Sequence, residues 1–245
     1  MVEIVEHRSI LFRTLSQVAK GKGMMMHRAL VIGASGGIGS ALCSALVSSG
    51  TEVTRLSRSA DGFDITDPAS VESAMNEVHG SFDTVLIASG ILAPESARPE
   101  KSLAEIDAKN MARVMAVNAI GPALVLKNLP RLLPRDSRCV VGVLTARVGS
   151  ISDNHLGGWY SYRAAKAAAN QVVRTAAIEI ARKRKQAIVV SLHPGTVDTS
   201  FTKAYPGHSK VAPTEAAANL ITTLDQLSLD QNGGFFDWAG NPVPW

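Results

Sequence analysis

The chain has 245 residues, of which 46% are hydrophobic, with two cysteines and a formal net charge of +4. No apolar run approaches a membrane span, and Cys43 and Cys139 stand apart, which excludes a transmembrane protein and a disulfide framework. The histidines lack the spacing of a metal motif, and the basic cluster Arg182–Lys185 ends a helical pattern, where cations stabilise a helix C-terminus. We therefore expect a cytoplasmic protein with no metal site and no membrane or nucleic-acid partner.

Residues 1–26 are expected to form an N-terminal extension outside a single domain at 27–245. They lack the apolar core of a secretory signal, and Lys20–Gly23 interrupts a weak helical pattern before the first strand. Residues 1–23 are interpreted as a flexible extension or as the result of a start assigned too far upstream, with Met24–Met26 as the true beginning. The alternative is a small amphipathic arm that packs on a neighbour.

From Arg28 onward, short β-branched runs alternate with longer helical patterns, an order typical of a parallel sheet with crossover helices. Strands are predicted at Ala29–Ile32, Glu52–Ser57, Thr84–Ala88, Arg138–Leu144, Ala187–Leu192 and Gly234–Asp237. Helices are predicted at Ile38–Ser48, Asp67–Val78, Ile106–Leu129, Tyr160–Lys183 and Thr214–Leu227. The predicted fold class is α/β, a single doubly wound parallel sheet of the Rossmann type with helices on both faces.

A glycine-rich turn joins the first predicted strand to the first predicted helix. Glycines allow a tight turn and a close approach of the backbone to a pyrophosphate, whose charge the free amides of a helix N-terminus favour. The pattern predicts a dinucleotide-binding loop, with a purely structural turn as the alternative. Its expected binding residues are Gly33, Ser35, Gly36, Gly37, Ile38 and Gly39.

The end of the second predicted strand indicates which dinucleotide would bind. An Asp or Glu at this position would accept hydrogen bonds from the ribose hydroxyl of NAD, but here Ser57 occupies it and Arg58 follows. A guanidinium can grip a 2′-phosphate, so we expect NADP(H) to be preferred, with NAD(H) possible. The alternative is that Arg58 is an ordinary exposed arginine.

Tyr162 stands four residues ahead of Lys166 in a predicted helix, which places both side chains on one face. A phenol with a pKa of about 10 is a poor acid or base at neutral pH, but a nearby ammonium stabilises the phenolate and lowers that pKa. Tyr162 is therefore a candidate for proton exchange with a carbonyl oxygen. By itself the spacing is commonplace, and a half-exposed surface pair is the alternative.

The glycine loop, the Tyr162–Lys166 pair and the Pro194-Gly195 turn jointly resemble the short-chain dehydrogenase/reductase family, over nearly everything from Arg28 onward. The resemblance implies hydride transfer between NADP(H) and a carbonyl or alcohol substrate, with Tyr162 as general acid/base. It implies that Lys166 tunes this tyrosine and holds the nicotinamide ribose. Asn118 would support a proton relay through water, with a helix-kinking polar residue as the alternative.

The resemblance also implies further cofactor contacts and an assembly. Val197 and Thr199 would bind the nicotinamide carboxamide, and Asp64 would contact adenine with Ile65 beside it. The subunits would pair as a homodimer or homotetramer through the helices predicted at 106–129 and 160–183. The remaining contacts expected from the resemblance are Ala88, Ser89, Gly90, Asn118, Tyr162, Lys166, Pro194 and Gly195.

The sequence departs from the family pattern at the catalytic serine, whose place is taken by Ala146. The loss of one oxyanion donor costs roughly 10²- to 10³-fold in rate unless a neighbour replaces it. Strand alternation aims Thr145 away from a site that Ala146 faces, so Ser150 is the preferred substitute, and an irregular strand end would favour Thr145 instead.

Two further departures concern the cofactor. Ser89 replaces a family asparagine, and only Ser59–Phe63 separate Arg58 from Asp64, too few residues for the usual crossover helix, so the adenine side should be open. These features resemble the C-factor-like and sniffer-like carbonyl reductase branch. The segment Ser200–Pro213 is a candidate substrate lid. The alternative function is an NAD(P)-binding regulatory or signalling protein with weak or no reductase activity.

Overall fold

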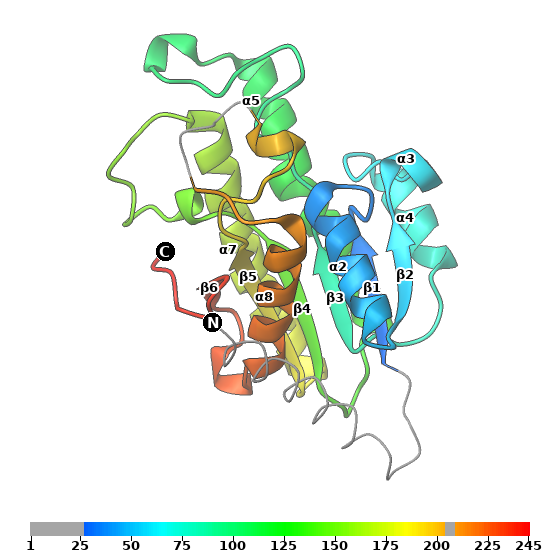
Figure 1. Ribbon diagram of the computed structural model, residues 1–245. Coiled ribbons are helices and arrows are strands. Elements are labelled where there is room, and N and C mark those ends of the chain that lie inside the picture. Colours follow the sequence, from blue (N-terminus) through cyan, green and yellow to red (C-terminus); the bar gives the residue numbers. More distant parts are fainter. Residues whose placement is uncertain (1–26, 204–208) are drawn as a thin grey trace, which may run out of the picture.

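Six parallel strands form one sheet in the order β2-β1-β3-β4-β5-β6, shown in the computed structural model of Figure 1. The structure describes residues 27–203 and 209–245. The predictions made for residues 1–26 therefore lie outside the described residues. The strands are β1 (Arg28–Ile32), β2 (Glu52–Leu56), β3 (Thr84–Ile87), β4 (Cys139–Leu144), β5 (Ala187–His193) and β6 (Phe235–Asp237).

Helices cover both faces of this sheet (Figure 1). One apolar cluster joins α4, α6 and α7 to the sheet, and a second joins α2 and α8 to its opposite face. The confirmed fold class is therefore a single doubly wound parallel sheet of the Rossmann type. The helices are α2 (Gly37–Ser48), α3 (Arg58–Asp61), α4 (Pro68–Glu77), α5 (Ala108–Met115), α6 (Gly121–Asn128), α7 (Tyr160–Lys183) and α8 (Pro213–Gln226).

The central strands are apolar on both sides because helices bury both faces. All six residues of β4 are buried, and Val141 and Val143 belong to the cluster beneath α7 while Val140 and Leu144 belong to the cluster beneath α8. Such near-continuous apolar runs are the mark of parallel strands. Every predicted strand boundary lies within one residue of the observed one, which is within the usual uncertainty of such limits.

The segment predicted as one helix from Ile106 to Leu129 is instead divided into three parts. Asp107 accepts a hydrogen bond of 2.8 Å from the backbone amide of Asn110, so α5 begins one residue later. A π-helical segment at Ala116–Ile120 then separates α5 from α6. The prediction of a continuous α-helix was wrong here, because the chain takes the wider π-helical form around the buried Asn118.

The short segment after β2 forms one helical turn, α3. Ser57 caps its N-terminus by accepting a hydrogen bond of 3.3 Å from the amide of Ala60, and Gly62 ends it in the left-handed region at φ 66°. The crossover to β3 is then made by α4, whose first turn is capped by Asp67. Within the described parts of the chain, no helix combines the length and apolar character needed to cross a membrane.

Candidate active site

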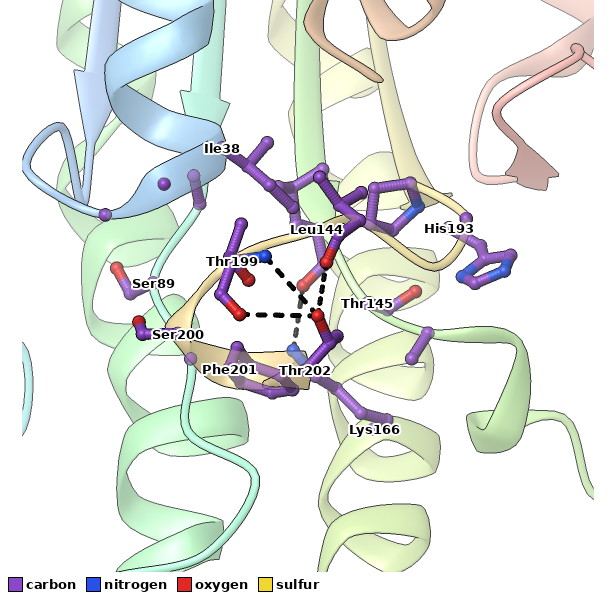
Figure 2. A pocket seen from close by; sticks show the side chains of 18 of the residues that line it. Ile38, Ser89, Leu144, Thr145, Lys166, His193, Thr199, Ser200, Phe201 and Thr202 are labelled. Carbon is purple, nitrogen blue, oxygen red and sulfur yellow. Dashed lines mark hydrogen bonds between the residues drawn. The ribbon is translucent and has the colours of Figure 1, made fainter. Parts of the chain in front are cut away.

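A cavity of about 240 Å³ opens at the carboxyl ends of the central strands, where parallel α/β sheets bind ligands. It brings together residues from the glycine loop, the end of β3, the end of β4, α7 and the segment that follows β5 (Figure 2). Most of the predicted site residues lie here. Those that line the cavity are Gly36, Gly37, Ile38, Ala88, Ser89, Gly90, Tyr162, Lys166, Pro194, Gly195, Val197 and Thr199.

The glycine loop is shaped by close backbone contacts that leave no room for side chains. Gly33 has φ +80°, and a Cβ there would lie 2.9 Å from the amide nitrogen of Ser89. A Cβ on Gly39 would lie 2.2 Å from the carbonyl oxygen of Gly33. Gly33 and Gly39 do not line the cavity themselves, but they fold the loop so that Gly36 and Gly37 do.

The start of α2 fits an anionic dinucleotide. Its N-cap, Gly36, offers no side-chain hydrogen bond, and no acidic residue occupies the first turn. The amides at this N-terminus are therefore free of side-chain caps and carry the positive end of the helix dipole. Ser35, which precedes them, is exposed at the same turn.

Tyr162 and Lys166 lie one turn apart near the start of α7, and both are buried in the cavity wall. The Lys166 ammonium donates a hydrogen bond of 2.9 Å to the carbonyl of Leu144 and lies 5.7 Å from the centroid of the Tyr162 ring. Figure 2 shows the lysine reaching across to the end of β4. The interpretation of the two as a half-exposed surface pair is therefore excluded.

The pKa values of this pair shift in a direction that the sequence did not indicate. We expected Lys166 to lower the pKa of Tyr162, but burial raises the pKa of this hydroxyl above its ordinary value. The same burial lowers the pKa of Lys166 to about 8. Removal from water disfavours whichever form is charged, so it moves an acid upward and a base downward. Tyr162 accordingly stays protonated at neutral pH.

Asn118 is fully buried in the π-helical segment and does not line the cavity. Its side-chain amide donates a hydrogen bond of 2.8 Å to the carbonyl of Ile91 and accepts one of 3.1 Å from the Ile91 amide. A Cβ on Gly90 would lie 2.9 Å from Asn118 Oδ1 and 3.5 Å from Lys166 Nζ. Asn118 thus both distorts its helix and locks the loop after β3 against Lys166.

The structure places the two candidates for the missing serine hydroxyl differently. Ser150 lies beyond a 3₁₀ turn, does not line the cavity, and accepts a hydrogen bond of 3.2 Å from the amide of Asp153. Thr145 and Ala146 both line it. β4 ends at Leu144, but the amide of Thr145 still donates a hydrogen bond of 2.8 Å to the carbonyl of Leu192, so Thr145 and Ala146 lie at the edge of the sheet where the cavity opens.

The residues expected to contact the adenosine half of the cofactor lie outside this cavity. Ser57 and Arg58, expected at the ribose, lie at the end of β2. Ser57 is buried, and its amide and hydroxyl donate to the Asp61 carboxylate at 2.8 and 3.1 Å. Arg58 is exposed and, within the described residues, has no ion-pair partner. Sequence reasoning missed Asp61, an acid four residues after Ser57 whose carboxylate folds back onto the N-terminus of α3.

Asp64 and Ile65 follow on the same side. Oδ1 of Asp64 accepts hydrogen bonds of 2.8 and 2.7 Å from the amide and hydroxyl of Thr66, and these bonds lower the pKa of Asp64. Ile65 is buried in the core, and a Cβ on Gly121 would lie 2.8 Å from its side chain. The hydrogen bonds from Thr66 therefore keep the Asp64 carboxylate ionised at the edge of the sheet.

The start of the candidate lid packs on Tyr162. Phe201 lines the cavity, and its ring centroid lies 5.9 Å from that of Tyr162. Lys210 donates a hydrogen bond of 2.7 Å to the carbonyl of Thr202, which links the later part of the predicted lid to its beginning. Residues 204–208, within the lid prediction, lie outside the described residues.

The N-terminus of α7 is anchored by a residue that sequence reasoning also missed. The buried carboxylate of Glu100 accepts hydrogen bonds from the amide of Ser161, at 3.2 Å, and from its hydroxyl. Trp159 precedes the helix at φ 52°, and its ring lies 6.1 Å from that of Tyr162. Glu100 lies 61 positions before Ser161, so the sequence gave no local signal of this contact.

Comparisons with known proteins agree with this geometry. The family model described as enoyl-(acyl carrier protein) reductase matches residues 33–225. The 1-hydroxy-2-glutathionyl-2-methyl-3-butene dehydrogenase of Rhodococcus sp. (strain AD45) is 34% identical over 188 residues, which cover 75% of this chain and 79% of that protein. The C-signal protein of Myxococcus xanthus is 33% identical over 144 residues, covering 59% of this chain and 84% of that protein.

A solved structure shares the fold. The NADPH-bound carbonyl reductase from chicken fatty liver matches with a TM-score of 0.78 at 23% identity, covering 91% of this chain and 96% of that one. The presence of C-signal among the relatives agrees with the expected C-factor-like branch. By its sequence relatives and by the family model that spans most of its length, the chain belongs to the short-chain dehydrogenase/reductase family of NAD(P)-dependent oxidoreductases.

Proposed function

We propose that this protein interconverts a small-molecule carbonyl compound and its alcohol, with NADP(H) as the preferred cofactor and Tyr162 as general acid/base. The observation that carries the proposal is one shared cavity. Tyr162 and Lys166 line it from α7, and Gly36 and Gly37 line it from the uncapped start of α2. A proton donor, a cation and an anion-binding helix terminus therefore meet at the carboxyl edge of the sheet.

The lining residues divide into two groups by the chemistry that they offer. The amides at Gly36–Ile38 would hold the pyrophosphate, and the segment from Pro194 to Thr199 would hold the nicotinamide end. When bound, the nicotinamide dinucleotide supplies or accepts the hydride. Gly90 leaves the backbone accessible beside Lys166, where the ribose would lie.

Tyr162 and Lys166 carry the proton step. Because burial raises the pKa of Tyr162, its hydroxyl is protonated at neutral pH and can donate to a substrate oxygen. Lys166, with a pKa of about 8, is mostly charged at pH 7 and stabilises the phenolate that remains. The hydrogen bond to Leu144 holds the ammonium in place.

We assign Asn118 to the relay that returns a proton to Lys166. Support comes from Gly90, which packs between Asn118 and Lys166, and from the π-helical segment, which changes the pairing of backbone carbonyls around this residue. Segments of this kind recur at functional sites, where the altered pairing exposes polar groups.

The choice of substrate class and cofactor rests on separate observations. One relative is named as the dehydrogenase of a hydroxylated glutathionyl butene, which supports an alcohol or carbonyl substrate. The exposed Arg58 supports NADP(H), although Asp61 beside it favours a ribose hydroxyl and keeps NAD(H) possible. We further propose that the protein acts in the cytoplasm, as a homodimer or homotetramer.

The decisive experiment is NADPH oxidation with a broad panel of aldehydes and ketones. Tyr162→Phe is expected to reduce turnover by at least about 10²-fold, because a positioned proton donor is lost. The control is Tyr160→Phe, on the same helix and outside the cavity lining. Equal turnover by the wild type and Tyr162→Phe would overturn the proposal. NADPH should stabilise both proteins against heat.

A second candidate function is that of an NAD(P)-binding regulatory or signalling protein. Two observations favour it: Ala146 lines the cavity where the family carries a serine, and one relative is named C-signal. This reading predicts that NADPH raises the melting temperature while no compound in the panel consumes it. The same two measurements therefore separate the two functions.

A further inference from the structure

Three polar side chains form a row across the carboxyl edge of β4, β5 and β6. The register pairs Leu144 with Leu192, and the amide of Thr145 donates a hydrogen bond of 2.8 Å to the carbonyl of Leu192. Thr145 therefore follows the same register and lies opposite His193. On the other side of β5, His193 pairs with Asp237. Paired residues of parallel strands point to the same face of a sheet.

Thr145 and His193 each bury a polar atom that lacks a partner. Over the described parts of the chain, Oγ1 of Thr145 and Nδ1 of His193 are both inaccessible to solvent and make no hydrogen bond. Both residues line the cavity, and Figure 2 shows their side chains on the same side of it. Unsatisfied buried polar groups are rare in folded proteins, and two on adjacent strands at one cavity point to a function.

Thr145 is placed where its hydroxyl can replace the serine hydroxyl that is missing at Ala146. Ala146, its neighbour, packs in an apolar cluster with Tyr162 and Ala165, so a serine hydroxyl there would have faced the tyrosine. Thr145 is the hydroxyl next to this position that lines the cavity, whereas Ser150 does not. A threonine hydroxyl donates one hydrogen bond and accepts others, so an incoming donor can direct its proton.

His193 can be that incoming donor. Burial lowers the pKa of His193 to about 4. The Asp237 carboxylate acts in the opposite direction, and Arg147 acts in the same direction as burial. The ring is therefore neutral at pH 7 and carries one N–H donor and one acceptor. Asp237 is already engaged, because its Oδ1 accepts hydrogen bonds of 2.9 Å from the amides of Ala239 and Asn241. Hydrogen bonds of a catalytic group are often long until substrate binds.

We propose that, when substrate binds, the buried Thr145 hydroxyl turns into the cavity and donates a hydrogen bond to the substrate oxygen in place of the serine missing at Ala146, and that His193 is the positioning residue that orients this hydroxyl. The inference rests on the proposed function, since it assigns the second donor of the same reaction. The hydrogen-bond donor to the substrate oxygen, Thr145, thus directly follows β4, and the residue that orients it, His193, ends β5.

The test removes one hydroxyl at a time. Thr145→Val is expected to lower kcat in NADPH-dependent carbonyl reduction by about 10²- to 10³-fold, the effect of losing one oxyanion donor. Thr145→Ser should retain most activity, and Thr145→Val combined with Ala146→Ser should recover it. The matched control is Ser191→Ala, which removes another buried, unpartnered hydroxyl two residues before His193 on β5 and outside the cavity lining. Its kcat should match the wild type.

The role of His193 is tested by non-additivity. His193→Phe should lower kcat about tenfold, and in the Thr145→Val background it should cause no further loss, because it acts only through that hydroxyl. Independent, multiplying losses would overturn the positioning role. Thr145→Val should melt at or above the wild-type temperature, since it removes an unsatisfied buried group.

The outcomes also separate this inference from the proposed function. Full activity in Thr145→Val, together with an inactive Tyr162→Phe, would overturn the inference and leave the function intact. If the wild type shows no turnover at all, the proposed function fails, and the ¹⁵N signals of the His193 imidazole decide the pairing. Thr145→Val should shift them more than Ser191→Ala does, and equal shifts would overturn the pairing.

Discussion

The ammonium of Lys166 donates a hydrogen bond of 2.9 Å to the carbonyl of Leu144, the last residue of β4. This bond ties the second turn of α7 to the edge of the sheet at the point where the cavity opens. It holds the Lys166 ammonium 5.7 Å from the centroid of the Tyr162 ring. Both side chains are buried, and this removal from water lowers the pKa of Lys166. The pH dependence of the enzyme follows from this arrangement.

Activity should fall as the pH rises through about 8. Burial lowers the pKa of Lys166 from 10.5 to about 8, so the ammonium loses its proton and its support for the phenolate above that pH. The measurement is kcat/KM for carbonyl reduction from pH 6 to 10, which reports the free enzyme. Lys166→Met should be inactive at every pH. A flat profile up to pH 10 in the wild type would contradict the assignment.

Asn118 should contribute strongly to stability. Asn118→Ala leaves the amide and carbonyl of the half-buried Ile91 without their partner, and we expect the free energy of unfolding to drop by about 2 kcal/mol. Urea denaturation measures it. Asn128→Ala is the matched control, because its amide donates to only one carbonyl, that of Leu124, in its own helix. A smaller loss at Asn118 than at Asn128 would be inconsistent with the observed contacts.

Cofactor preference should depend on the charges at the end of β2. Arg58→Ala should weaken NADP(H) binding about tenfold and leave NAD(H) binding nearly unchanged, because the guanidinium meets only the 2′-phosphate. Asp61→Asn should act in the opposite direction, since it removes a negative charge bonded to Ser57. Fluorescence titration with each cofactor measures both. Arg55→Ala, on the side of β2 that meets Cys43, is the control. Equal losses for both cofactors in Arg58→Ala would refute the phosphate role.

Acid should destabilise the protein through His193. Its pKa is about 4 when folded and 6.5 as the ordinary value, so the unfolded chain binds a proton that the folded one does not as the pH falls from 6.5 to 4. The free energy of unfolding should decline over that window by on the order of 3 kcal/mol. His193→Phe should flatten the decline, and His155→Gln, at an exposed histidine, should not. An identical decline in His193→Phe would assign the effect to other groups.

The groove between α6 and α7 should be the subunit contact. Small and apolar side chains line it, among them Ala123, Leu126, Val172 and Ala176. A bulky charge at the half-buried Ala176 should prevent a second helix pair from packing there, so Ala176→Arg should sediment as a monomer at micromolar concentration. Ser44→Arg, an exposed position on α2, is the control. A monomeric wild type would show that this groove does not pair subunits.

Much of the site could be predicted because its signals are local. The glycine loop, the spacing from Tyr162 to Lys166 and the Pro194-Gly195 turn are each contained in a few residues. Of the residues predicted for them, all except Gly33, Ser35 and Gly39 line the cavity. The strands could be predicted equally well, because a strand that is buried on both faces is a continuous run of apolar residues. The helix predicted to start at Asp67 does begin there, because Asp67 caps the N-terminus of α4.

The misses share a different cause. Glu100 acts on a group that the chain brings near only after folding, and no spacing in the sequence joins it to Ser161. Asp61 lies only four residues after Ser57, but its contact depends on the single helical turn of α3. The sequence favoured Ser150 over Thr145, but whether a residue after Leu144 lines the cavity depends on how the chain leaves β4, and Thr145 lines it while Ser150 does not. The upward shift of the Tyr162 pKa depends on complete burial, which neighbouring sequence does not report.

The sequence by itself determined the order of strands and helices, the dinucleotide loop and the tyrosine–lysine pair, because backbone propensity, apolar periodicity and i,i+4 spacing act over a few residues. Only the tertiary structure decided which polar groups are buried and which strand ends lie side by side. Burial sets the protonation of Tyr162, Lys166 and His193, and strand register sets Thr145 opposite His193. Desolvation and cross-strand pairing are properties of the packed molecule, so no stretch of sequence encodes them locally.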